Sequence, residues 1–160
     1  MGILRTIIAA GRVAEPAGPP PAGEDLPAAA RLRGSLQLRH VDAGSCGGCE
    51  LEIAGCFSPV YDAERFGARL VASPRHADGL LVTGVVTQNM AQAVRETHRA
   101  LPEPAIVIAV GECACNGGEL DDGYGVVGPV SSVLPVDLEV HGCPPHPDAI
   151  IAALRRVTGR

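Results

Sequence analysis

The chain has 160 residues, enough for one domain with a sizeable buried core. Its net charge of −5 argues against a surface that binds nucleic acid, and no apolar run approaches the roughly 20 residues that a membrane-spanning helix needs. Hydrophobic residues make up 46% of the chain and aromatic residues 2%, so the predicted core consists of Ala, Val, Leu and Ile. We expect a cytoplasmic protein, in which six cysteines indicate metal ligands or redox groups rather than disulfides.

The pattern and composition of residues 1–31 predict two segments that precede the folded domain. Ile3, Leu4, Ile7 and Ile8 fall on one side of a helix. Residues 1–14 are therefore interpreted as an amphipathic helix that lies on a membrane surface or in a partner's groove, with a frayed terminus as the alternative. Residues 15–31 are rich in Pro, Gly and Ala, a composition that predicts a semi-extended linker. The domain is expected to cover residues 32–160.

From residue 32 onward, strand-like and helix-like segments alternate. Short apolar runs predict strands, and segments with apolar residues at helical spacing or with helix-start signals predict helices. This alternation predicts an α/β fold with a flavodoxin-like, doubly wound, mostly parallel sheet and helices on both faces. The predicted strands are 36–41, 69–72, 79–83, 105–110 and 136–140, and the predicted helices are 49–56, 88–101 and 146–157.

Four cysteines follow predicted strands. Cys46 and Cys49 come after the first strand and are separated by two glycines, so the loop can aim both sulfurs at one point. Cys113 and Cys143 each follow a later apolar strand. Ligands gather beyond the carboxyl ends of the strands in this architecture, so the four sulfurs are expected to form one site. Four converging cysteines are typical of zinc or an iron–sulfur cluster.

The spacing of these cysteines favours a cluster over zinc. Zinc sites usually use two Cys-x-x-Cys pairs, whereas here Cys113 and Cys143 are delivered singly from two distant strand ends. Pro144 directly after Cys143 adds support, because a proline follows a ligand cysteine in ferredoxin-type sites. A redox-active dithiol of Cys46 and Cys49 is a third reading, but it leaves the other two cysteines without a role.

Further cysteines and two acidic residues lie near the predicted site. Cys56 is expected to point away from it as a small buried hydrophobe. Cys115 is expected to lie beside the site, lining the cluster or the surface over it. Glu50 and Glu52 open a predicted helix, whose dipole favours negative charge there, and a role of Glu50 in proton transfer is the alternative interpretation.

Five segments of the chain resemble a known family over about residues 36–155. They are GSCGGCE (44–50), DAERFG (62–67), SPRHAD (73–78), GECA (111–114) and PVD (135–137) through GCPP (142–145). The family is the small, electron-transferring subunit of group 4, energy-converting membrane-bound [NiFe] hydrogenases of the formate hydrogenlyase type, which is homologous to the PSST-type subunit of complex I. The complex I homologues carry two adjacent cysteines in the first motif, so Gly47-Gly48 indicates the hydrogenase branch. His146 departs from the family pattern, in which Arg or a small residue is more usual.

The resemblance implies one [4Fe-4S] cluster, held by Cys46, Cys49, Cys113 and Cys143. The chain would be an electron-transfer subunit of an oxidoreductase complex whose catalytic site lies in a hydrogenase large subunit. No cysteine follows Cys143, so the resemblance implies that electrons leave through a ferredoxin-like iron–sulfur subunit. Integral membrane subunits would hold the complex peripherally at the cytoplasmic side of the inner membrane. The alternatives are a complex I-like quinone-reductase subunit, a subunit of a nickel-free hydrogenase-related complex and, more distantly, a structural zinc module.

Overall fold

The computed structural model describes residues 3–11, 18–19, 32 and 34–160. An α-helix, α1 (Ile3–Ala10), lies inside the segment that was predicted as amphipathic, and all of its side chains are exposed. Most of the predicted linker 15–31 lies outside the described residues. Among the helices of the described ranges, none has the length and apolar character that crossing a bilayer requires.

Five parallel strands form the central sheet in the order β2-β1-β3-β5-β7. Counted along the chain, these strands have the order 2-1-3-4-5, which is the order of flavodoxin-like doubly wound sheets. The predicted α/β fold class is therefore confirmed. The strands are β1 (Leu36–Asp42), β2 (Ala68–Leu70), β3 (Gly79–Thr83), β5 (Ile106–Val110) and β7 (Leu138–Val140).

The three longer helices of the domain match the predicted segments, and several short elements were not predicted. The helices are α2 (Gly48–Cys56), α3 (Gln88–Arg99) and α5 (Pro147–Thr158). The additional elements are too short to produce a readable periodicity. They are α4 (Glu112–Asn116), the antiparallel pair β4 (Val86–Thr87) and β6 (Val126–Gly128), and the 3-10 turns η2 (Ala63–Phe66), η3 (Pro74–His76), η4 (Gly118–Leu120) and η5 (Val130–Ser132).

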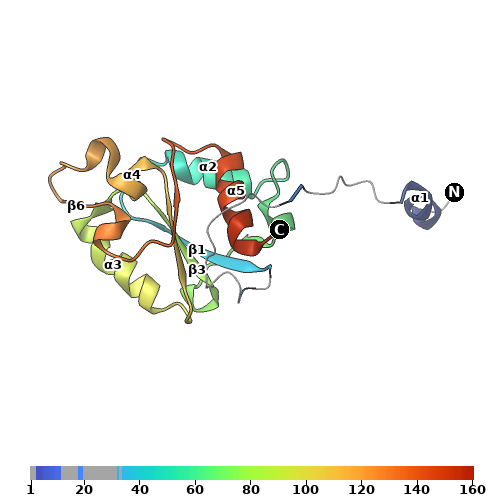
Figure 1. Cartoon of the computed structure of the whole chain (residues 1–160), viewed down its shortest axis with the longest axis horizontal. Helices are drawn as coiled ribbons and strands as arrows, with labels where there is room; N and C mark the ends of the chain where they lie inside the picture. Colours follow the sequence, from blue (N-terminus) through green and yellow to red (C-terminus); the bar gives the residue numbers. More distant parts are fainter. Residues whose placement is uncertain (1–2, 12–17, 20–31, 33) are drawn as a thin grey trace.

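The sheet is covered on both faces, and β3 shows why it must be (Figure 1). All five residues of β3 are buried, and successive side chains point to opposite faces of the strand. Leu81 packs into the core with α2 and α5, whereas Leu80 and Val82 pack into the core with α3. A strand that is apolar on both faces is stable only between two layers of helices.

Two aspartates pin the amino ends of neighbouring strands. Asp78 precedes β3 and accepts a hydrogen bond of 2.8 Å from the backbone N–H of Gln37 in β1. Asp137 precedes β7 and accepts one of 2.7 Å from the N–H of Val107 in β5. The SPRHAD and PVD segments therefore contribute to the sheet at the end opposite the cysteines.

The burial of β3 yields a prediction about stability. Leu81 is fully buried, so Leu81→Ala should lower the free energy of unfolding by about 2–5 kcal/mol through lost burial and the remaining cavity. Leu70 lies on the edge strand β2 and is 38% exposed, so Leu70→Ala is the control and should cost about 1 kcal/mol or less. Anaerobic urea unfolding measures both values. Equal losses would contradict the central position of β3.

Candidate metal centre

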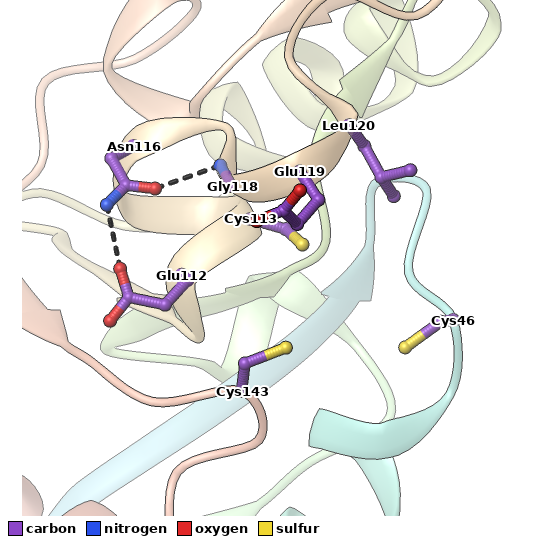
Figure 2. Close-up of a pocket in the computed structure, with 8 residues that line it drawn as sticks. All are labelled: Cys46, Glu112, Cys113, Asn116, Gly118, Glu119, Leu120 and Cys143. Carbon is purple, nitrogen blue, oxygen red and sulfur yellow. Dashed lines mark hydrogen bonds between the residues drawn. The ribbon is translucent and has the colours of Figure 1, made fainter.

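The four cysteines that follow strands line one cavity. Cys46 lies in the loop after β1, Cys49 in the first turn of α2, Cys113 in α4 after β5, and Cys143 in the loop after β7. All four contribute to the wall of a cavity of about 160 Å³. Figure 2 shows the sulfurs of Cys46, Cys113 and Cys143 facing a common space. The structure thus brings the four predicted residues together at the carboxyl edge of the sheet.

The cavity is more open on one side than on the other. Cys46 and Cys143 are exposed, whereas Cys49 and Cys113 are partly buried. A larger hollow of about 410 Å³ shares Cys46, Cys113 and Cys143 with the cavity and is also bordered by Leu120 of η4 (Figure 2). A group held by the four sulfurs would therefore be shielded by the sheet and accessible from the side of Cys46 and Cys143.

A glycine at the end of β5 leaves room for one of the sulfurs. Gly111 has φ +93°, a conformation that favours glycine, and a Cβ atom there would lie 2.5 Å from the Sγ atom of Cys49. The chain can therefore turn from β5 into α4 only if this position carries no side chain. The missing side chain of Gly111 therefore leaves the space that the Sγ atom of Cys49 occupies.

Burial and mutual repulsion oppose deprotonation of these thiols. Burial first, and then the negative charges of Glu50 and the other three cysteines, raise the pKa of Cys49 to about 12. The pKa of Cys113 is also raised, mainly by burial and then by Cys143 and Cys46. Thiolates at these positions need a compensating positive centre. This donor set therefore suits a thiolate-binding metal centre rather than a free dithiol.

The spread of the sulfurs bears on the size of that centre. All four cysteines belong to the described residues, and no three of their sulfurs lie within 4.8 Å of one another. Sulfurs around one tetrahedral zinc ion, with bonds of about 2.3 Å, would lie only about 3.8 Å apart. As they lie in the structure, the four sulfurs are spread more widely than the ligands of one zinc ion, and cysteine thiolates are also the ligands of iron–sulfur clusters.

Glu50 lies beside the cavity in a chain of polar groups. Its Oε2 atom accepts a hydrogen bond of 2.6 Å from the hydroxyl of Ser45, and its Oε1 atom accepts one from the hydroxyl of the fully buried Thr83. The Nε2 atom of His40 lies 2.9 Å from the Thr83 hydroxyl and 3.8 Å from Oε1 of Glu50. Burial lowers the pKa of His40, which favours its neutral form. The sequence suggested Glu50 but not its partners.

Glu112 ties together the two segments that carry Cys113 and Cys143. Its backbone N–H donates to the carbonyl of Gly142 at 2.9 Å, and its Oε1 atom accepts from the N–H of Gly142 at 3.1 Å. Hydrogen bonds from His141 first, and then from Asn116 and Gly142, lower the pKa of Glu112 below its usual value. This role was missed in the sequence, where the only signal was the position of Glu112 beside a cysteine.

Two cysteines lie outside the cavity wall. Cys56 is fully buried in α2, where its thiol donates to the carbonyl of Pro147 at 3.5 Å, in keeping with the expected hydrophobic role. Cys115 differs from the expectation that it lines the site. Its thiol points toward the carbonyls of Ala109 and Val140, both at 3.7 Å. Residues two apart on a helix point in nearly opposite directions, so Cys113 and Cys115 face different sides of α4.

His146 has a local structural role. Its Nδ1 atom accepts a hydrogen bond of 3.3 Å from the backbone N–H of Asp148, so it caps the amino end of α5. Residues such as Ser, Asp and Asn are more usual at this position, so this cap was not predicted from the sequence. Glu52, the other acidic residue singled out from the sequence, is partly exposed on α2.

Comparison with known proteins gives consistent results. Residues 46–157 match the family described as NADH ubiquinone oxidoreductase, 20 Kd subunit. The chain is 48% identical over 112 residues to a probable membrane-bound hydrogenase subunit, mbhJ, of Pyrococcus furiosus, covering 70% of this chain and 67% of that protein. It is 42% identical over 129 residues to formate hydrogenlyase subunit 7 of Escherichia coli K12, covering 81% of this chain but about half (51%) of the relative.

A solved structure is similar as well. It is a chain of the membrane-bound sulfane sulfur reductase, described as an archaeal respiratory membrane complex, with 31% identity and a TM-score of 0.70. The match covers 81% of this chain and 72% of that chain. The likeness therefore extends over most of the domain.

The close approach of Gly111 to Cys49 yields a prediction about the site. Gly111→Ala should displace the Sγ atom of Cys49 and strongly reduce the iron bound per chain after anaerobic assembly with iron and sulfide. Gly125→Ala is a matched control, because Gly125 has a similar φ of +84° but nothing within 4 Å of an added Cβ. Iron analysis measures both. Equal iron contents in the two variants would contradict this account of the cavity wall.

Proposed function

This chain belongs to the family of the 20 Kd subunit of NADH ubiquinone oxidoreductase, and we propose that it is the iron–sulfur electron-transfer subunit of a membrane-associated [NiFe] hydrogenase complex. It is thus a subunit of an oxidoreductase complex, with the catalytic site proper in a partner large subunit. The observation that carries the proposal is the meeting of four thiols from three strand ends at one cavity. Family membership supports the same conclusion.

The residues that would hold the cofactor are Cys46, Cys49, Cys113 and Cys143. When bound, one [4Fe-4S] cluster would supply one-electron transfer between the H2 site of the large subunit and a ferredoxin-like subunit. The wide spacing of the sulfurs supports a cluster over a single zinc ion. The chain's own contribution is to fix the four sulfurs on rigid strand ends, with Glu112 and Gly142 holding two of the ligand segments in register.

A second candidate function follows from the relatives. Two of them are named as subunits of hydrogenase or formate hydrogenlyase, but the similar solved structure is a sulfane sulfur reductase. A nickel-free hydrogenase-related complex, or a complex I-like quinone reductase, would use this subunit in the same way. The Gly47-Gly48 spacing between Cys46 and Cys49 supports the hydrogenase branch, because complex I homologues carry adjacent cysteines there.

The partner large subunit is proposed to cover the open side of the cavity. Leu51, two residues after Cys49, is 76% exposed, and Leu120 at the adjoining hollow is 45% exposed. Exposed leucines beside a metal site suit burial in a subunit interface. The names of two relatives place those proteins in membrane-bound complexes, which supports membrane association of this chain's complex. This subunit is further proposed to attach peripherally to integral membrane subunits, on the cytoplasmic side of the inner membrane. Residues 1–14 and 15–31 are proposed as a helix and a linker that precede the domain at 32–160.

Glu50 is proposed to take part in proton transfer at this interface. The Thr83 hydroxyl donates to one carboxylate oxygen of Glu50 and lies within hydrogen-bond distance of His40. The Ser45 hydroxyl donates to the other oxygen, beside the loop that carries Cys46. Neutral His40 donating through Nε2–H to Thr83, which in turn donates to Glu50, would form a path along which a proton can move.

The proposal predicts how the intact complex responds to hydrogen. After anaerobic purification, exposure to H2 alone should produce the low-temperature EPR signal of a reduced [4Fe-4S] cluster. If the signal appears only after dithionite is added, the cluster is retained but the hydrogenase assignment is wrong, in favour of the second candidate. A colourless complex without iron would contradict both and indicate a zinc module.

Two cysteine variants serve as controls for the ligand assignment. Cys46→Ser should remove or convert the cluster and uncouple the complex from its electron acceptor. Cys56→Ser changes a thiol that lies in the core between α2 and α5, so it should leave the iron content unchanged. Loss of iron in Cys56→Ser together with retention in Cys46→Ser would overturn the assignment.

A variant of Glu50 tests the proton path. Glu50→Gln keeps the size of the side chain but removes the ionisable group, so hydrogen turnover by the complex should fall by roughly 10²-fold or more while the iron content stays unchanged. Glu52→Gln makes the same change two residues away and should retain full turnover. H2-dependent reduction of a dye by the purified complex measures both. Equal rates would assign Glu50 a purely structural role.

A further inference from the structure

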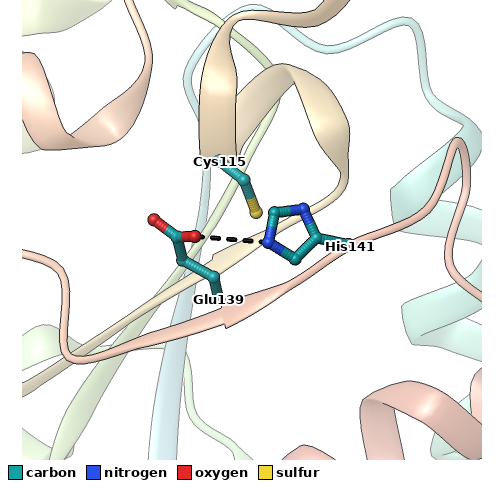
Figure 3. Close-up of side chains that lie close together, drawn as sticks. All are labelled: Cys115, Glu139 and His141. Atoms are coloured by element: carbon teal, nitrogen blue, oxygen red, sulfur yellow. Dashed lines mark ion pairs between the residues drawn. The ribbon is translucent and has the colours of Figure 1, made fainter.

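A second group of metal-ligating side chains lies outside the four-cysteine cavity. Cys115 of α4, Glu139 of β7 and His141 directly after β7 each offer a ligand atom, and the three atoms lie within 4.8 Å of one another (Figure 3). Glu139 and His141 are two positions apart on an extended segment, so both point to the same side as the Cys115 thiol. Among the described residues, no other group of three or more His, Cys, Asp or Glu side chains has its ligand atoms this close together.

The imidazole of His141 is already oriented for metal binding. Its Nδ1 atom lies 3.4 Å from the carboxylate of Glu112, and its Nε2 atom lies 3.3 Å from Oε2 of Glu139. Glu112 is itself held by the side-chain amide of Asn116 at 2.7 Å. Metal-binding histidines usually donate their second ring N–H to a carboxylate in this way, which leaves the other nitrogen free for the metal.

The chemistry of the three groups selects the ion. A thiolate, an imidazole and a carboxylate together suit Zn²⁺, which accepts all three ligand types in tetrahedral sites. Glu139 and His141 are exposed at the sheet edge, so their side chains can rotate to close the remaining distance. Three protein ligands leave a fourth position for water or for a side chain of a partner.

We propose that Cys115, Glu139 and His141 form a Zn²⁺ site, separate from the four-cysteine cavity and on the opposite side of α4. On binding, the Cys115 thiol would form an S–Zn bond and release its proton to solvent. The present partners of this thiol are two backbone carbonyls, both at 3.7 Å, which it would exchange for the metal. The proposal does not depend on the function of the four-cysteine site.

The test uses the full chain with its four-cysteine site first loaded with iron and sulfide under anaerobic conditions. Zinc is then added, weakly bound metal is removed with a chelator, and the retained zinc is quantified per chain. About one zinc should remain, and X-ray absorption at the zinc edge should show a single sulfur neighbour with nitrogen and oxygen ligands. A coordination shell of four sulfurs would place zinc in the other site and overturn the proposal.

Variants separate a built site from incidental binding. His141→Ala should weaken zinc binding by roughly tenfold or more, and Cys115→Ser should remove the sulfur neighbour from the absorption spectrum. His146→Ala is the matched control, because His146 is an exposed histidine that lies 3.3 Å from the carboxylate of Asp148 and is not part of the group. Equal zinc affinity in His141→Ala and His146→Ala, or no retained zinc in the unchanged protein, would overturn the proposal. If Cys115→Ser fails to fold, the comparison of the exposed histidines still decides.

Discussion

The parallel register of the sheet is the constraint on which the site depends. Because β1, β3, β5 and β7 all run in the same direction, their carboxyl ends meet at one edge, although they are far apart in the sequence. The loops after β1, β5 and β7 can then deliver four sulfurs to one cavity without any long excursion of the chain. A reversal of one strand would carry its cysteine to the opposite end of the sheet.

Groups that can carry negative charge gather at and beside the cavity, and the chain holds its two carboxylates there with hydrogen-bond donors. Glu50 receives two hydroxyl hydrogen bonds, from Ser45 and Thr83, while Glu112 receives bonds from the Gly142 backbone and the Asn116 side chain. These donors fix the two carboxylates beside thiols whose own deprotonation is opposed by burial and repulsion. The proposed cluster would supply the positive charge that this arrangement requires, with the thiols as its ligands.

The sequence predicted those features that depend on local pattern. Apolar runs predicted the five strands of the main sheet, and the position of cysteines after them predicted which residues meet. What it missed depends on contacts between distant segments. The hydrogen bond from Val107 to Asp137, the tie between Glu112 and Gly142, and the pairing of β4 with β6 join residues whose proximity follows only from the completed fold. The cap supplied by His146 was missed because histidine is an unusual residue at that position.

The short helix α4 contributes one cysteine to each of the two proposed sites. At about 100° per residue, Cys113 and Cys115 point in nearly opposite directions, so one thiol enters the four-cysteine cavity while the other meets the edge strand β7. Glu112 contacts both proposed sites. It accepts a hydrogen bond from Gly142, next to Cys143, and it lies within ion-pair distance of His141. A zinc ion bound by His141 would therefore share a carboxylate partner with the segments that carry the proposed cluster ligands. The two sites are thus linked in space by one carboxylate, which contacts His141 on one side and the Gly142 backbone on the other.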